Sequence, residues 1–260
     1  MLICTILAVR ILTGNKKMCL SAVIIVKNAE HTLEKTLQSL SLFKEILIYD
    51  TGSTDKSKTI ALTFANVRWI DGYFDQFGTT KNRAVATARY DWIFSLDADE
   101  SVDAQLAQSM LTFPFDKPET VGEILRENWF YGQAVTVGGW GNDRLIRLFH
   151  RRYHQFSNRC VHESVVIDKN THVIALSGRL QHQAVTDLAQ LITKIDRYSA
   201  LSAQIVPKKP FFIIVLKTFY AFIRSYFFQC GFLAGWRGFT IAVYEANNVY
   251  FKYLRAKIKS

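Results

Sequence analysis

The chain has 260 residues, of which 49% are hydrophobic, and its formal net charge is +10. A chain of this length forms one large domain, or a domain with an appendage, that buries most of the surface it exposes when unfolded. Residues 207–260 contain six Lys, three Arg and one acid, which places about +8 of the charge there and excludes a uniformly basic nucleic-acid binder. The four cysteines have no paired spacing, which argues against a disulfide framework or a zinc site and predicts reduced thiols in the cytosol.

The first 17 residues have the features of neither a leader peptide nor a membrane span. Leu2 to Leu12 is apolar except for Thr5 and Arg10, but no basic region precedes it and no cleavage site follows it. The run is also far shorter than the ~20 residues of a membrane-spanning helix. Because Met18 directly precedes the first convincing strand, we expect residues 1–17 to be peripheral, or Met18 to be the natural start.

Apolar runs and helical repeats alternate in the first half of the chain. Strands are predicted over residues 20–26, 45–49, 67–70 and 90–96, and helices over residues 33–40, 56–64 and 79–88. The strands are nearly continuous apolar runs, which is typical of strands covered on both faces. This alternation predicts a parallel sheet with right-handed crossovers.

A short acidic cluster, residues 96–100, follows the fourth of these strands. Its two aspartates, Asp97 and Asp99, stand one residue apart at the carboxyl end of the strand, where open α/β sheets bind their ligands. Such a pair can hold a hard divalent cation whose shell is completed by water and substrate phosphates. The alternative is an acidic turn that caps a helix over residues 101–110, and the cluster alone does not separate the two.

The regular alternation of strands and helices ends after about residue 113. Mixed strands are predicted over residues 122–130, 143–149, 164–167 and 172–175, followed by a helix over residues 186–205. This part is loop-rich and of the α+β type, which suits the shaping of a second substrate site.

The last segment combines aromatic and aliphatic residues at helical spacing with basic residues. We predict helices over residues 211–228 and 239–255, and the longest uncharged stretch, residues 225–236, has twelve residues. Because a spanning helix needs about 20 apolar residues, we predict amphipathic helices that lie in the membrane interface.

Four segments of the first half occur in an order that resembles the family 2 glycosyltransferases of the GT-A fold. They are Val26-Lys27-Asn28, Asp50 to Asp55, Gly78 to Asn82, and Leu96 to Glu100. The second half contributes Gly138-Gly139-Trp140, Arg144 to Phe149, Val161-His162-Glu163 and Gly231 to Trp236. Together they look like the bacterial enzymes that add glucose to a heptose of the lipopolysaccharide inner core.

The resemblance implies an α/β fold of the GT-A type, with a Rossmann-like, mostly parallel sheet and an amphipathic C-terminal helical segment. Residues 18–115 would bind the nucleotide sugar, residues 116–206 the acceptor, and residues 207–260 the membrane. The expected location is cytoplasmic, peripheral on the inner membrane of a bacterium. The expected partners are a UDP-sugar, a lipid-linked acceptor (the lipid A–Kdo–heptose core) and an anionic membrane surface, and not a nucleic acid.

The resemblance also implies roles for donor-site residues. Asp50 would accept a hydrogen bond from the uracil imide, and the turn that includes Val26 and Asn28 would form the wall of the base pocket. Lys81 would meet the diphosphate, and Asp97 the ribose or, through water, a metal ion.

The implied cofactor is Mg²⁺ or Mn²⁺, which would offset the charge that gathers on the leaving diphosphate. Asp99 is the preferred direct ligand, and His162 would complete the shell, with a surface histidine as the alternative. Of Arg144 and Arg147, one would reach a phosphate, and we favour Arg147. Asp55 and Glu100 are interpreted as helix-capping residues.

An inverting transfer also needs a base beside the acceptor hydroxyl. The resemblance points to Glu163, with Asp143 as its rival.

Other UDP-sugars (galactose or N-acetylglucosamine) and other envelope glycans remain alternatives, as does a non-catalytic nucleotide- or carbohydrate-binding protein. A phosphoaspartate receiver domain also has carboxylates at strand ends, but it has no place for the second half and the basic tail.

Overall fold

The structure is a computed structural model that describes residues 18–157 and 163–258. Residues 1–17, which we expect to be peripheral, and the expected metal ligand His162 lie outside the described residues. The chain divides into two compact units. Unit 1 comprises residues up to Arg126 and Arg144–His182, and unit 2 comprises Glu127–Asp143 and Gln183–Ser260.

Unit 1 contains the alternating strands and helices that the sequence predicts. In chain order they are β1 (Met18–Val26), α2 (Leu33–Ser39), β2 (Phe43–Asp50), α3 (Ser57–Ala61), β3 (Val67–Asp71), α4 (Phe77–Ala86), β4 (Trp92–Asp97), β5 (Glu100–Val102), α5 (Ala104–Leu111), β8 (Asp143–His150) and β9 (His172–Ala175). Two strands, β6 (Thr120–Phe130) and β10 (Leu180–Val185), begin in unit 1 and end in unit 2, and β8 begins with Asp143 of unit 2 and continues in unit 1.

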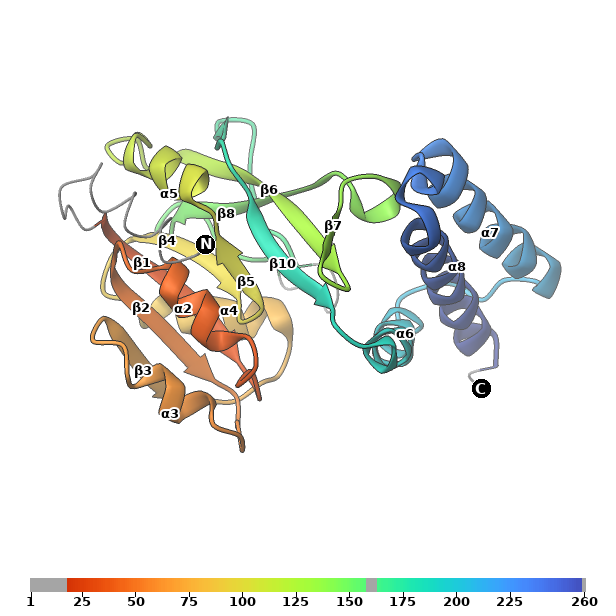
Figure 1. Cartoon of the computed structure of the whole chain (residues 1–260), viewed down its shortest axis with the longest axis horizontal. Helices are drawn as coiled ribbons and strands as arrows, with labels where there is room; N and C mark the ends of the chain where they lie inside the picture. The colour runs from red at the N-terminus through yellow and green to blue at the C-terminus, as the bar shows by residue number, and fades with distance from the viewer. Residues whose placement is uncertain (1–17, 158–162, 259–260) are drawn as a thin grey trace. The chain divides into compact units, whose positions relative to one another are not determined.

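The strand order is β3-β2-β1-β4-β8-β6-β10-β5, with β9 paired to β6 (Figure 1). The first four strands in this order are parallel, as predicted, and β8 pairs with β4 in the antiparallel direction. In the parallel register Val26 lies opposite Asp50, and Ile25 lies opposite Asp97. The carboxyl ends of β1, β2 and β4 therefore meet at one edge.

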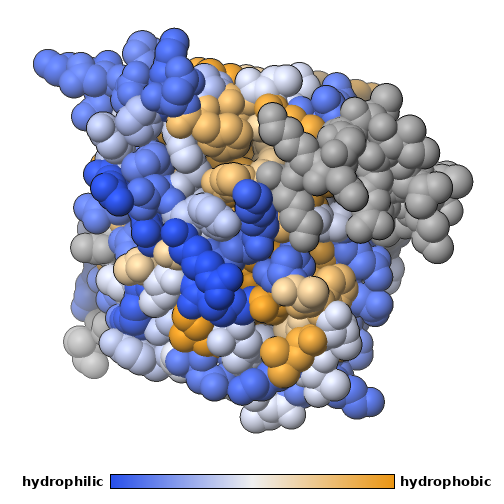
Figure 2. All heavy atoms as spheres, turned by 90° about the vertical axis from the view of Figure 1, so that its left-hand side faces the viewer, coloured by the Kyte–Doolittle hydropathy of each residue, from blue (hydrophilic) through white to orange (hydrophobic). Residues whose placement is uncertain are grey.

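Alternating residues of β1 face two different cores. Leu20, Ala22 and Ile24 pack in one cluster with residues of α2, α3 and α5, whereas Val23 packs in a second cluster with residues of α4. Helices thus cover both faces of the parallel strands, which accounts for their nearly continuous apolar sequences. On the side of the chain that is on the left in Figure 1, hydrophilic side chains cover most of the surface and hydrophobic ones form smaller patches (Figure 2).

Two of the predicted elements in unit 1 differ from the structure. Residues 164–167 form no strand, and only an isolated bridge joins Val165 to Phe156. The helix predicted from residue 101 begins later, because Glu100–Val102 is the strand β5 and Asp103 caps α5 by accepting a hydrogen bond from the Leu106 amide.

Unit 2 is mainly helical. Its elements are β7 (Gln133–Val135), η1 (Gly138–Trp140), α6 (Leu188–Ser202), α7 (Phe211–Ile223), η2 (Arg224–Phe228), η3 (Gly231–Ala234) and α8 (Gly235–Ile258). Glycines allow η1 and η3 to approach α8 closely: a Cβ at Gly139 would lie 1.7 Å from Oε1 of Glu245, on α8. A Cβ at Gly238 would lie 1.8 Å from the carbonyl oxygen of Gly231. The two glycine motifs seen in the sequence are therefore packing motifs of one unit.

The helices of unit 2 expose many large apolar side chains. On α7 and η2 these are Phe211, Phe212, Val215, Leu216, Phe219, Tyr220, Phe227 and Phe228. By length and composition, the helical segment Phe211–Phe228 is apolar enough to cross a membrane, and 17% of it is buried. Lys217 and Arg224 interrupt the apolar sequence without ending the helical run. That the helices of the tail lie in the membrane interface stays a prediction.

Candidate active site

The turns after β1 and β2 are tied together by hydrogen bonds. The amide of Asn28 donates to Oγ of Ser53 (2.9 Å), and Oδ1 of Asn28 accepts from the Thr54 amide (2.8 Å). Asn28 has a φ of 54°, a left-handed conformation that asparagine tolerates better than most residues. The carbonyl oxygen of Val26 accepts from the Thr51 amide (2.9 Å). The predicted walls of the base pocket thus belong to one hydrogen-bonded loop pair.

Asp50 is buried at the carboxyl end of β2 and holds its own turn. Its carboxylate accepts hydrogen bonds from the Gly52 amide (3.2 Å), the Ser53 amide (3.0 Å) and the Ser53 hydroxyl. The Ser53 amide also lies 3.2 Å from Oδ1, so the two carboxylate oxygens share its hydrogen bond. Asp50 therefore orders the turn after β2, beside the predicted wall of the base pocket.

Asp97, at the end of β4, lies between two buried cations. Nζ of Lys81 is 3.1 Å from Oδ1, and Nη2 of Arg147 is 3.0 Å from Oδ2. Burial by itself would raise the pKa of Asp97, but the charges of Lys81 and Arg147 hold that pKa well below its usual value. Asp97 is thus an ionised carboxylate that fixes two cations at the strand ends.

Lys81, from α4, also reaches the candidate base. Its Nζ donates to Oε1 of Glu163 over 2.7 Å and lies 5.3 Å from the ring centroid of Phe156. The lysine side chain is 5% exposed and that of Glu163 is 16% exposed. One buried ammonium group therefore connects the acidic cluster with the carboxylate expected to face the acceptor.

Glu100 is a member of this site that the sequence did not reveal. Predicted as a helix cap, it is fully buried in β5, and its Oε1 accepts from Arg147 (2.9 Å) and Arg126 (3.2 Å). Its Oε2 accepts from the Asp97 amide (2.9 Å). Burial lowers the pKa of Arg147, but Glu100 and Asp97 more than compensate and raise it above its ordinary value. Glu100 thus anchors Arg147 beneath Asp97.

The other arginine of the pair lies on the opposite face of β8. Arg144 is half-exposed and forms an ion pair with Glu123 (3.2 Å). The expectation that only one of the two arginines belongs to the site therefore agrees with the structure, which places Arg147 in the cluster.

Asp99 points to a different partner from Asp97. Its Oδ2 lies 3.4 Å from Nε2 of His182, on β10, and its side chain is 36% exposed. Residues 18–157 and 163–258 contain no group of three His, Cys, Asp or Glu side chains arranged to hold a metal ion. A Mg²⁺ ion commonly needs only one or two carboxylates together with water and substrate phosphates. Asp99 with His182 beside it fits such an open site, in which the substrate supplies further ligands.

Asp143, the rival base, begins β8 and belongs to unit 2. Its Oδ2 lies 3.4 Å from Nδ2 of Asn128, in the same unit. Unit 1, by contrast, brings together Lys81, Asp97, Arg147 and Glu163. The structure thus gives Glu163 a direct link to the acidic cluster.

Residues 21–171 match the model of the family Glycosyl transferase family 2. The chain belongs to this family. It is a glycosyltransferase, and its α/β sheet with the C-terminal helices agrees with the predicted GT-A fold.

This glycosyltransferase also resembles individual proteins over most of its length. It is 29% identical over 242 residues to the lipopolysaccharide core biosynthesis glycosyltransferase LpsC of Rhizobium meliloti, covering 88% of this chain and 89% of LpsC. An uncharacterized glycosyltransferase of Rickettsia typhi is 25% identical over 86% of this chain and 82% of that protein. Among solved structures, S. aureus TarS 1-349 in complex with UDP has a TM-score of 0.47 and 13% identity, covering 92% of this chain and 90% of that one.

Proposed function

We propose that this glycosyltransferase moves a hexose from a UDP-sugar, with inversion, onto a heptose of the lipopolysaccharide inner core. UDP-glucose is the first choice of donor, and UDP-galactose, UDP-N-acetylglucosamine or another envelope glycan acceptor are the alternatives. The observation that carries the proposal is the chain of contacts from Asp97 through Lys81 to Glu163. It links a donor-side carboxylate to an acceptor-side carboxylate. The similarity to LpsC supports the acceptor class.

The donor would bind across the carboxyl ends of β1, β2 and β4. Asp50 would accept a hydrogen bond from the uracil imide, and the loop pair that includes Val26 and Asn28 would enclose the base. Lys81 and Arg147 would meet the diphosphate, because they are buried cations at the strand ends.

A divalent cation, Mg²⁺ or Mn²⁺, fits beside Asp99. When bound, it would offset the negative charge that develops on the departing diphosphate. Asp99 would be its direct ligand, with Asp97 acting through water, because Asp97 is already engaged by Lys81 and Arg147. His162 remains a predicted ligand, and His182 is a second candidate because of its place beside Asp99.

In the transfer step, the acceptor hydroxyl oxygen would form a bond to the anomeric carbon while the bond from that carbon to the diphosphate oxygen breaks. The hydroxyl proton would pass to the Glu163 carboxylate, and UDP would leave with the electron pair. Lys81 would hold Glu163 in place through its 2.7 Å hydrogen bond. Asp143 stays the alternative base.

The tail would bring the enzyme to its lipid acceptor at the cytoplasmic face of the inner membrane. Residues 207–260 combine a large basic excess with the exposed aromatic side chains of α7 and η2. Basic residues attract anionic lipids, and aromatic side chains insert into the interface.

Calorimetric titration of the purified protein with UDP-glucose, with and without Mn²⁺, tests the donor site. UDP-galactose and UDP-N-acetylglucosamine serve as competitors. We expect metal-dependent binding with a preference for one sugar. Absence of binding to any uridine nucleotide by the folded protein would contradict the proposal.

A further inference from the structure

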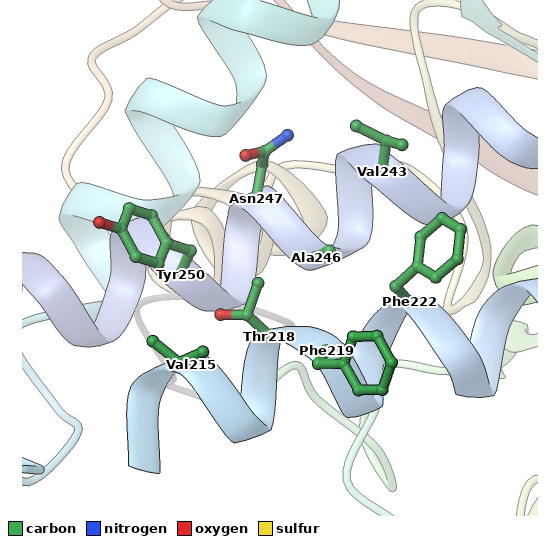
Figure 3. Close-up of a pocket in the computed structure, with 8 residues that line it drawn as sticks. All are labelled: Val215, Thr218, Phe219, Phe222, Val243, Ala246, Asn247 and Tyr250. Atoms are coloured by element: carbon green, nitrogen blue, oxygen red, sulfur yellow. The ribbon is translucent and has the colours of Figure 1, made fainter. Parts of the chain in front are cut away.

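A groove runs between α7 and α8 of unit 2 (Figure 3). Four residues of each helix line it: Val215, Thr218, Phe219, Phe222, Val243, Ala246, Asn247 and Tyr250. We call it the tail groove. Its volume is about 400 Å³, within the range of ~300–1,000 Å³ that is usual for ligand pockets.

The tail groove is elongated. On each helix its residues follow the spacing i, i+3, i+4 and i+7, so each helix contributes one continuous stripe. Seven residues of helix extend over about 10 Å. The small side chain of Ala246 lies near the middle, between Val215 and Tyr250 at one end and Phe222 and Val243 at the other (Figure 3). The shape suits a narrow chain-like ligand.

The walls of the groove are largely apolar and in part open to solvent. The side chains of Val215 and Phe219 are 46% and 65% exposed. The hydroxyl of Thr218 donates to the carbonyl oxygen of Ile214 (2.8 Å), so it is already satisfied within the helix. Apolar surface left in water favours an apolar occupant.

Two lysines lie over the ring of Tyr253, which follows the groove residue Tyr250 by three positions on α8. Nζ of Lys217 is 5.6 Å from the ring centroid of Tyr253, and Nζ of Lys252 is 5.0 Å from the same centroid. Lys217 is two positions after the groove residue Val215, and Lys252 is two positions after Tyr250. The side chain of Lys217 is exposed. An apolar ligand with a negatively charged head matches this arrangement.

We propose that the tail groove binds one acyl chain of a membrane phospholipid with an anionic headgroup. The chain would lie between α7 and α8, and Lys217 and Lys252 would contact the phosphate. This is a discrete site with one lipid per protein, distinct from general attraction of the basic tail to a charged surface. It does not depend on the sugar donor or acceptor.

Native mass spectrometry of the full chain, released from mild detergent with phosphatidylglycerol or phosphatidylcholine present, tests the proposal. We expect one phosphatidylglycerol molecule to remain bound and phosphatidylcholine to bind at least tenfold more weakly. Val243→Trp should fill the groove and reduce the lipid-bound fraction at least tenfold. Leu233→Trp is the matched control, because Leu233 is 68% exposed in the same tail but does not line the groove.

The headgroup contact has its own test. Neutralising both lysines in Lys217→Gln/Lys252→Gln should remove the preference for phosphatidylglycerol. The equal charge change in Lys117→Gln/Lys169→Gln, at exposed positions of unit 1, should leave it intact.

Three results would overturn the proposal: no discrete lipid adduct, equal loss in Val243→Trp and Leu233→Trp, or the same lipid preference in both lysine double variants. Circular dichroism of each variant establishes that it is folded. A chain that instead retains a stoichiometric protein partner across α7 and α8, and no lipid, would also contradict the lipid assignment.

Discussion

Asp97 and Asp99 stand one residue apart, yet their side chains have different surroundings. Asp97 is held by Lys81 and Arg147, whereas Asp99 faces His182 and is partly exposed. An ionised carboxylate that already pairs with two cations gains less from a metal ion than a partly exposed carboxylate that has neither cation beside it. These contacts are the reason why we propose Asp99 as the direct metal ligand and Asp97 as a residue that acts through water.

We predict that Asp99→Asn lowers metal-dependent transfer about 100-fold, because stabilisation of leaving-group charge by a metal ion is worth several kcal/mol. Steady-state rates over a Mn²⁺ series measure this effect. Asp116→Asn, at an exposed loop position, is the control and should behave as wild type. Near wild-type activity in Asp99→Asn, with an unchanged circular dichroism spectrum, would refute the metal assignment.

At the scale of the elements, Glu100 connects three strands. Its carboxylate on β5 binds Arg126 on β6 and Arg147 on β8. Removing one member of a buried ion pair leaves an uncompensated charge, which typically costs about 3–5 kcal/mol. The contact is therefore both a support of the site and a large contribution to stability.

We expect Glu100→Gln to lower the free energy of unfolding by about 3 kcal/mol. The melting temperature should fall by about 6–12 °C, since ~1 kcal/mol corresponds to roughly 2–4 °C at this size. Glu123→Gln, which breaks the surface pair with Arg144, should cost about 1 kcal/mol or less. Equal decreases in melting temperature for the two substitutions would contradict a larger contribution of the buried Glu100 ion pairs to stability.

In unit 2, Glu245 on α8 is packed against the turn that contains Gly139. Burial raises its pKa, and the Ser225 hydroxyl and Arg224 counteract the rise only in part. The pKa of Glu245 is higher in the folded protein than in the unfolded chain. The contribution of Glu245 to stability is therefore complete at pH values below its unfolded-state pKa, and it is lost as the pH rises through its folded-state pKa.

Glu245→Gln should therefore raise the melting temperature at pH 7–8, and the gain should shrink toward about pH 4, near the ordinary pKa of glutamate. Glu34→Gln, on the exposed face of α2, serves as the reference. A gain that is constant with pH, or a loss at neutral pH, would contradict the burial argument.

The sequence predicted the parallel strands and the positions of Asp50 and Asp97, because each apolar run ends at its acid. It did not predict the burial of Glu100, whose arginine partners lie 26 and 47 positions away. Nor did it predict the contact between Lys81 and Glu163, which are 82 positions apart. Such contacts depend on how distant strands and helices come together, and neither composition nor periodicity carries that information.

At the scale of the whole molecule, charge is concentrated in residues 207–260, with nine basic residues and one acid. Each basic residue near an anionic leaflet is worth about 1 kcal/mol, and salt screens this attraction. This concentration of charge is the basis of the proposal that the enzyme works at a lipid surface.

Sedimentation with phosphatidylglycerol-containing vesicles should show strong binding at ~0.1 M salt, with a severalfold loss at ~0.5 M as the Debye length shortens. Phosphatidylcholine vesicles provide the reference for purely apolar insertion. Binding that is the same on both vesicles and unaffected by salt would contradict an electrostatic role for the tail.

The central claim is that Glu163 is the base of a sugar transfer, and a transfer assay with Glu163→Gln tests it most directly. The assay uses the donor identified by titration and a heptose-terminated lipid A core acceptor, with Asp143→Asn as the matched comparison. We predict that Glu163→Gln binds the donor as wild type does and transfers at least about 100-fold more slowly, the usual minimum contribution of a general base. Wild-type transfer by Glu163→Gln, or the defect in Asp143→Asn alone, would contradict the account.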